Sequence, residues 1–132
     1  MITGINHITI TVSDLEKSFD FYSQNLGMKP EVKWASGAYL SAGSLWVCLS
    51  VGLPRPSNDY SHIAFSIAEA RFQEYSEKLS KLGISTWQEN SSEGQSLYIL
   101  DPDGHKLEIH VGNLSTRLAA LKENPYNGLV WF

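Results

Sequence analysis

The feature of this sequence that most constrains its fold is a pattern repeated in its two halves. Residues 6–12 and 61–67 both alternate small or polar side chains with apolar ones, which is typical of a strand with one face in a core. His7 and His62 hold the same place in the two runs. A repeat of this kind indicates two copies of one supersecondary unit.

The repeat continues through a helix and three further strands in each copy. Apolar residues recur every three or four positions after the first strands, at Leu15, Phe19, Tyr22 and Leu26 and again at Phe72, Tyr75, Leu79 and Leu82. Strand-like runs follow at 30–35, 38–42 and 45–51 in the first copy, and at 84–89, 96–100 and 105–111 in the second. The predicted fold class is therefore α+β, with two βαβββ modules.

Local signals mark the ends of these elements. Gly27 and Gly83 stand where helix C-caps are expected, and Ser13 with Glu16 predicts a capping box at the start of the first helix. Residues 101–104 form a glycine-containing turn that closes a hairpin.

The chain is predicted to be one domain of 132 residues. Its parts are a first module at about 1–52, a proline-containing linker at 53–60, a second module at about 61–112, and a C-terminal helix and tail at 113–132. Asn113 is the predicted cap of that last helix.

A four-stranded sheet with one helix leaves its edges and its concave face uncovered. Two modules paired around that concavity form a cup and solve both problems. The pairing can occur within one chain or between two chains, and the short linker favours a domain-swapped homodimer.

Composition narrows the classes of function. The chain is 42% hydrophobic with a net charge of −4 and no basic run, so nucleic acid is not an expected partner. No apolar stretch is long enough to cross a membrane, and the N-terminus lacks the pattern of a signal peptide. The single cysteine, Cys48, fits a reducing compartment, so the expected location is cytoplasmic.

Two histidines and one carboxylate are the candidate metal ligands. A lone histidine beside an apolar strand is more often a surface or core residue, but His7 and His62 occupy matched positions in the two repeats. Glu108 lies in the last strand, on the face opposite Leu107 and Ile109. Convergence of these three side chains in the cup predicts a two-histidine, one-carboxylate site with open positions for a divalent ion acting as a Lewis acid.

Other polar residues near this site allow several interpretations. Cys48 is the repeat counterpart of Glu108, and it is either a fourth ligand, a neighbouring group or a small buried hydrophobe. His105 is expected to face solvent. His110 shares the strand face of Glu108, where it can be a neighbour of the ligands but is not an expected ligand. The hydroxyl-rich loop 90–96 is suited to a monovalent cation or an anionic oxygen group, although an ordinary polar loop has the same composition.

Several strings are distinctive in combination. They lie at residues 5–7, 37–40, 45–50, 59–62, 92–94, 98, 101–108, 110–112 and 117–120. The chain carrying them resembles, along almost its whole length, the fosfomycin-glutathione transferases (FosA type) of the vicinal oxygen chelate, or glyoxalase/dioxygenase, superfamily. The resemblance implies a Mn²⁺ enzyme, activated by K⁺, that adds the thiol of glutathione to the epoxide of fosfomycin. It also implies a homodimer with exchanged modules, in which each metal site takes ligands from both chains.

The resemblance assigns roles residue by residue. The metal ligands are His7, His62 and Glu108, and the residues with catalytic roles are Thr9, Tyr39 and Arg117. The substrate-binding residues are Thr9, Trp46, Gln88, Ser92, Ser96, Tyr98 and Arg117. The potassium loop comprises Asn90, Ser92, Glu93, Gly94 and Ser96, and the pocket is lined by Trp34, Trp46 and Cys48.

Departures from the family pattern and rival functions qualify this prediction. The family usually has Lys where Gln88 stands and a basic residue where Ser91 stands, so this chain is expected to bind fosfomycin more weakly or to use another thiol. A glyoxalase needs a carboxylate in place of Cys48, and a hydrolytic enzyme needs a carboxylate base, yet residues 33–58 contain none. A dioxygenase with the same ligands and a drug-binding protein are the remaining alternatives.

Overall fold

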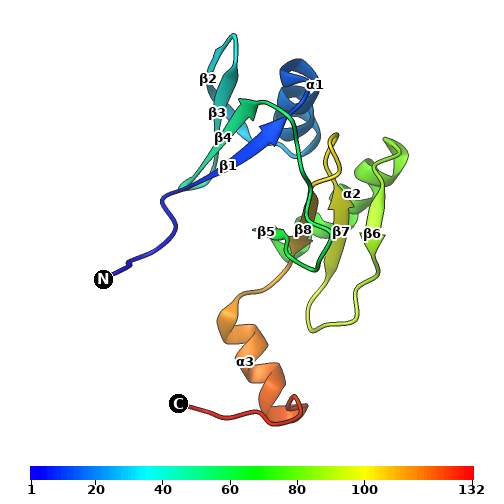
Figure 1. The fold of residues 1–132 in the computed structure, drawn as a ribbon. Coiled ribbons are helices and arrows are strands. Elements are labelled where there is room, and N and C mark those ends of the chain that lie inside the picture. Colours follow the sequence, from blue (N-terminus) through cyan, green and yellow to red (C-terminus); the bar gives the residue numbers. More distant parts are fainter. The chain divides into compact units, whose positions relative to one another are not determined.

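The computed structural model describes residues 1–132 and divides them into two compact units, each built on one four-stranded sheet (Figure 1). The first unit comprises residues 1–59 and 101–105, and the second comprises residues 60–100 and 106–132. The first unit contains β1 (His7–Val12), α1 (Leu15–Asp20), the π-helical turn η1 (Phe21–Asn25), β2 (Lys29–Trp34), β3 (Gly37–Ala42) and β4 (Leu45–Val51). The second contains β5 (Ile63–Ser66), α2 (Glu69–Lys81), β6 (Thr86–Gln88), β7 (Ser96–Leu100), β8 (Lys106–His110) and α3 (Leu114–Glu123).

The two sheets share one topology, which confirms the predicted pair of βαβββ modules. Their strand orders are β1-β4-β3-β2 and β5-β8-β7-β6, with the first pair parallel and the others antiparallel in each sheet. Cys48 is in register with Thr9 and Tyr39. Glu108 is in register with Ala64 and Tyr98. Cys48 is therefore the structural counterpart of Glu108, as the repeat predicts.

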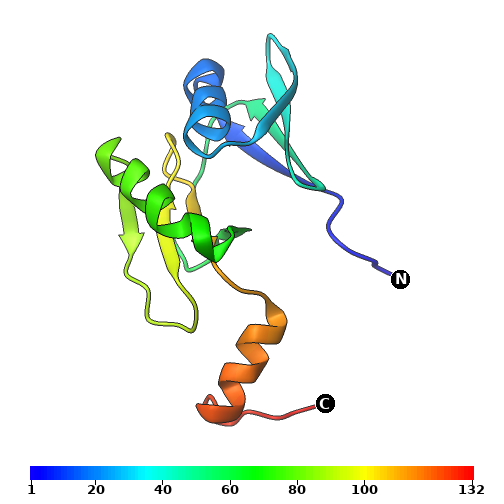
Figure 2. The same ribbon diagram turned by 180° about the vertical axis from the view of Figure 1, so that it is seen from behind.

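Alternating side chains give each sheet one covered face. In the first unit Ile10, Leu40, Val47 and Leu49 are buried with Tyr22. His7 and Thr9 are exposed and alternate with Ile8, which is half-buried, and Ile10. Figure 2 shows α1 and α2 each lying against one side of its own sheet. The opposite face of the first sheet is left open for other contacts.

The second unit has an equivalent core. Phe65, Ile99 and Leu107 are buried together with Phe72 and Leu79 of α2. Phe72 and Leu79 are core positions, as the apolar spacing predicts, and Tyr75 is half-buried. Leu82 follows the helix as its C-cap and is exposed, so the prediction is wrong for this position. No helix in the structure has both the length and the apolar character that spanning a bilayer requires.

The last helix begins at a capping box. The side chain of Asn113 accepts a hydrogen bond from the Thr116 amide at 3.1 Å, and the Thr116 hydroxyl accepts one from the Asn113 amide at 2.9 Å. The predicted cap at Asn113 is confirmed. Because reciprocal capping satisfies two amides that lack partners within a helix, α3 has a defined start.

The predicted capping box at Ser13 and Glu16 is wrong. Asp14 is the N-cap of α1, and its side chain accepts from the Lys17 amide at 3.1 Å. Both the amide and the hydroxyl of Ser13 donate instead to the carboxylate of Asp103. Ser13 is therefore hydrogen-bonded to Asp103, a residue outside the helix, and Asp14 caps the helix in its place.

The turn at residues 101–105 is anchored by a buried carboxylate. Asp101, only 5% exposed, accepts hydrogen bonds from the Tyr22 hydroxyl at 2.8 Å, the Asp103 amide at 3.0 Å and the His105 amide at 2.8 Å. Burial and the neighbouring Asp101 raise the pKa of Tyr22, so its hydroxyl stays protonated and donates. His105 does not face solvent as expected, because its Nε2 donates to the Thr11 carbonyl at 2.7 Å.

Replacing Asp101 with Ala is expected to lower the free energy of unfolding by about 3 kcal/mol, because three donors lose a buried acceptor. Urea denaturation of the two proteins measures the difference. Asp20 is an exposed aspartate in the same unit whose side chain makes no capping bond. Asp20→Ala is the matched control and should change stability by less than about 0.5 kcal/mol. Equal changes in the free energy of unfolding for the two substitutions would show that the hydrogen bonds of Asp101 do not stabilise the protein.

Candidate active site

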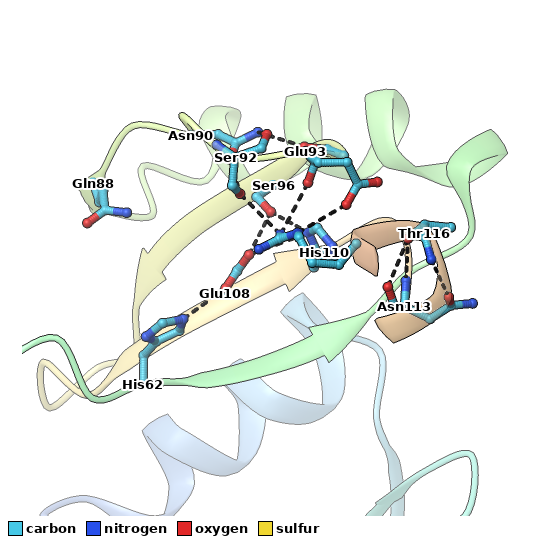
Figure 3. Close-up of polar contacts among 12 residues, drawn as sticks. His62, Gln88, Asn90, Ser92, Glu93, Ser96, Glu108, His110, Asn113 and Thr116 are labelled. Carbon is cyan, nitrogen blue, oxygen red and sulfur yellow. Dashed lines mark hydrogen bonds and ion pairs between the residues drawn. The ribbon is translucent and has the colours of Figure 1, made fainter. Parts of the chain in front are cut away.

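Glu108 is the centre of a buried polar cluster in the second unit (Figure 3). In the middle of β8, the residue is only 7% exposed. Its Oε2 lies 2.8 Å from Nε2 of His62, and its Oε1 lies 2.6 Å from the hydroxyl of Ser96. Two of the three predicted metal ligands are thus in direct contact.

The contact between His62 and Glu108 needs a positive charge. His62 Nδ1 lies 2.7 Å from the Tyr60 carbonyl, an acceptor only, so Nδ1 carries a proton. In the neutral ring the lone pair of Nε2 then faces a carboxylate oxygen at 2.8 Å. Either a second proton or a cation makes this arrangement favourable. A carbonyl that orients the far nitrogen is also the usual partner of a metal-bound histidine.

The donor set of this pair fits a divalent ion. One imidazole nitrogen and one carboxylate oxygen are ligands that Mn²⁺ and related ions accept. Neighbouring ligands of an octahedral ion at about 2.1 Å lie about 3 Å apart, close to the observed 2.8 Å. His62 and Glu108 can therefore hold one ion between them with little movement.

Hydrogen bonding keeps the carboxylate ionised. Burial alone would raise the pKa of Glu108, but the hydrogen bonds with Ser96 and His62 and the charge of His110 outweigh it. The pKa of this carboxyl therefore lies below its usual value. A charged carboxylate is the form that binds cations.

His7, the third predicted ligand, opens β1 of the first unit. Its Nδ1 lies 2.7 Å from the Asn6 side-chain oxygen, which repeats the arrangement of His62 and leaves Nε2 as the free ring nitrogen. In the structure no three His, Cys, Asp or Glu side chains gather closely enough to hold an ion. The contact between His62 and Glu108 is the part of the predicted ligand set that the structure brings together.

The open face of the first sheet carries a row of aromatic rings. His7 stacks on Trp46 with ring centres 4.4 Å apart, Trp46 contacts Tyr39 at 5.1 Å, and Tyr39 contacts Trp34 at 4.9 Å. Thr9 and Cys48 are paired in register beside this row. The residues predicted to touch the substrate from the first module, Thr9, Tyr39 and Trp46, therefore lie together.

A cationic side chain lies beside the loop 90–96 in the second unit. Arg117 of α3 donates from Nε to Glu93 Oε2 at 3.2 Å and from a terminal nitrogen to the Ser92 hydroxyl at 3.3 Å. Burial alone would lower the pKa of Arg117, but hydrogen bonds with Glu93 and Tyr126 raise it above its usual value. A hollow of about 340 Å³ adjoins this guanidinium, lined by Ser91, Ser92, Glu93, Arg117, Ala120, Leu121, Asn124 and Tyr126.

The loop itself is held by internal hydrogen bonds. The side-chain Nδ2 of Asn90 donates to the Gly94 carbonyl at 2.7 Å, and Asn90 Oδ1 accepts from the backbone amide of Ser92 at 3.1 Å. Gly94 has a φ of +79°, and a Cβ there would lie 2.5 Å from the Val111 carbonyl, so only glycine fits. This geometry fixes Ser92 and Glu93 beside Arg117.

Two further predicted residues border the cluster. Gln88 donates to the Tyr60 hydroxyl at 3.3 Å. Tyr98 is buried on β7, and burial raises its pKa, so its phenol remains a neutral hydrogen-bond donor.

Two residues of the cluster were not predicted. Tyr60 orients His62 through its carbonyl, and Trp87 places its ring 5.3 Å from His62 and 5.2 Å from Tyr98. His110 contacts Ser96 at 2.6 Å. It lies on the face of Glu108, as the alternation of β8 predicts.

Comparison with known proteins places the chain in a family. Residues 4–109 match the model of the Glyoxalase/Bleomycin resistance protein/Dioxygenase superfamily. The chain is 48% identical to the glutathione transferase FosA of Serratia marcescens, covering 99% of this chain and 96% of that protein. It is 41% identical to the metallothiol transferase FosB of Lysinibacillus sphaericus, covering 92% of each.

Solved structures agree with this assignment. A mutant of the fosfomycin resistance protein FosX from Listeria monocytogenes, complexed with Mn(II) and 1S,2S-dihydroxypropylphosphonic acid, superposes with a TM-score of 0.80 at 31% identity. The match covers 90% of this chain and 99% of that one. The chain therefore belongs to the glyoxalase/bleomycin resistance protein/dioxygenase superfamily and, within it, to the group of FosA, FosB and FosX proteins.

Proposed function

We propose that this protein inactivates fosfomycin by adding the thiol of glutathione to its epoxide, with Mn²⁺ as the metal. The observation that carries the proposal is the 48% identity, over nearly the full length, to a glutathione transferase. The related FosX protein was crystallised with Mn(II) and a phosphonate. The function agrees with the one expected from the sequence.

The proposed metal ligands are His62, Glu108 and His7. When bound, Mn²⁺ would stabilise the negative charge that develops on the epoxide oxygen. The protein contributes a carboxylate kept ionised by Ser96 and a histidine oriented by the Tyr60 carbonyl. Both effects fix the ligands before the substrate arrives.

The remaining residues orient the substrate in this proposal. Arg117 and Ser92 would hold the phosphonate, with the phenol of Tyr98 as a further donor. The thiolate sulfur forms a bond with one epoxide carbon, the bond from that carbon to oxygen breaks, and the oxygen takes up a proton to become a hydroxyl group. Thr9 and Tyr39 would lie beside the reacting groups, on the aromatic face of the first sheet.

We also propose that K⁺ binds at the loop formed by Asn90, Ser92, Glu93, Gly94 and Ser96. The carboxylate of Glu93 accepts a hydrogen bond from Arg117 Nε at 3.2 Å, so it lies next to the proposed phosphonate site. A cation there would neutralise Glu93 and leave more of the positive charge of Arg117 for the phosphonate.

A homodimer in the cytoplasm completes the proposal. Duplicated modules with matched histidines allow each site to combine one module from each of two chains. The single, half-buried Cys48 fits a reducing compartment.

The test is product analysis by mass spectrometry. Purified protein given Mn²⁺, K⁺, fosfomycin and glutathione is expected to form the thioether adduct, and chelation of the metal should stop the reaction. Cysteine and bacillithiol are the comparison thiols, because Gln88 and Ser91 leave the site with fewer cationic groups than the family pattern. A diol instead of an adduct would show a hydrolase, and intact fosfomycin with every thiol would refute the proposal.

A further inference from the structure

We propose that His110 is a positioning residue, which holds Glu108 in its ligating orientation through the hydroxyl of Ser96. This inference rests on the proposed function, because it concerns the carboxylate assigned to the metal. Its starting point is a continuous chain of polar atoms from His110 through Ser96 and Glu108 to His62 (Figure 3).

The direction of each hydrogen bond follows from counting protons. Ser96 has one hydroxyl proton, and Glu108 Oε1, 2.6 Å away, only accepts in the carboxylate form that binds a cation. Ser96 therefore donates to Glu108. His110 Nδ1, 2.6 Å from the same hydroxyl oxygen, must then be the donor to Ser96. The serine proton cannot turn away from Glu108 without losing one of two short hydrogen bonds.

The ring of His110 is itself fixed by the backbone around it. A Cβ on Gly94 would lie 3.0 Å from its Cε1, and a Cβ on Gly112 would lie 3.2 Å from its Nε2. Both glycines have positive φ values, +79° and +124°, which favour glycine at these positions. The side chain of His110 is only 16% exposed. The imidazole is therefore held between two glycines with Nδ1 directed at Ser96.

This arrangement separates the two oxygens of Glu108. Oε1 is occupied by Ser96, and His110 Nδ1 lies 3.5 Å from it. Oε2 faces His62 at 2.8 Å. The carboxylate therefore presents one oxygen to an ion and keeps the other for the protein. Partners that orient a metal ligand in this way are typically worth about 10- to 100-fold in metal affinity.

The experiment compares three substitutions of His110 in the full-length protein, with Mn²⁺ binding measured by electron paramagnetic resonance in the absence of substrate. Asn places an amide nitrogen near the position of Nδ1, whereas Gln places it near Nε2 and Ala offers no donor. We expect His110→Asn to retain Mn²⁺ affinity within about threefold, and His110→Gln and His110→Ala to lose about 10- to 100-fold. Thermal unfolding of each variant identifies any loss caused by misfolding.

A double-mutant cycle shows whether the effect passes through the serine. Ser96→Ala should weaken Mn²⁺ binding about as much as His110→Ala, and the double variant should be no weaker than either one. Losses that multiply, or a His110→Gln protein that binds Mn²⁺ as the wild type does, would overturn the inference. Wild-type protein that binds Mn²⁺ without forming the adduct would refute the proposed reaction and leave the positioning role standing. Wild-type protein that binds no Mn²⁺ would refute both.

Discussion

Glu108→Gln is expected to abolish adduct formation while leaving the protein folded. Glutamine keeps the shape of the side chain but lacks the charge that binds a cation, and its amide group turns a donor toward one of the two partners of Glu108. Losing this ligand should reduce kcat/KM by about 1000-fold, equivalent to about 4 kcal/mol of transition-state stabilisation. Adduct formation and Mn²⁺ affinity, measured on the same preparation, give the two effects separately.

Glu123 supplies the matched control for this substitution. It is an exposed glutamate at the end of α3, so Glu123→Gln removes the same charge without touching the cluster. It should change kcat/KM by less than about twofold, because exposed charges are screened by solvent and salt. A Glu108→Gln enzyme with wild-type turnover would exclude Glu108 as a ligand. Lost turnover with unchanged Mn²⁺ affinity would place its role in the chemical step.

A mixed dimer of two inactive chains is expected to recover about half of the wild-type activity. One chain carries His7→Ala and the other Glu108→Gln, and two affinity tags allow the mixed dimer to be isolated. If each site takes His7 from one chain and Glu108 from its partner, one of the two sites has no substitution and the other has both. Activity and Mn²⁺ stoichiometry per dimer are the measurements.

The reciprocal pairing provides the control. A wild-type chain paired with a chain that carries both substitutions has no intact site in the exchanged arrangement and should be inactive. If each chain builds its own site, this second dimer is the half-active one and the first is inactive. The two pairings thus give opposite results, and failure to isolate any mixed dimer would refute the proposed homodimer.

The secondary structure was predictable because duplication supplied each pattern twice. Strands β4 (Leu45–Val51) and β7 (Ser96–Leu100) match the predicted bounds, since short alternating runs between glycine turns have few alternatives. The start of α1 was not predictable from local signals. Ser13, Asp14 and Glu16 all suit a helix start, and the choice depends on Asp103, ninety residues further along the chain.

The sequence predicted which residues belong to the candidate site, but it did not predict which of them are in contact. The matched positions of His7 and His62 and the alternation around Glu108 predicted which side chains to consider, and the structure places Glu108 against His62. His105 was expected to face solvent because it follows an Asp-Gly turn, yet it donates to the Thr11 carbonyl. Hydrogen bonds between distant segments, such as those of His105 and Ser96, depend on packing that no local pattern encodes.

The equivalence of Cys48 and Glu108 has an evolutionary consequence. Two copies of one module share a backbone register, but only the second copy has the carboxylate. Substitutions at the second copy are constrained by the need to hold a charge, because Glu108 has little solvent around it. The first copy is free of that constraint, and its open face carries the aromatic row from His7 to Trp34. The side chain at position 48 can therefore change without removing the carboxylate, which position 108 supplies.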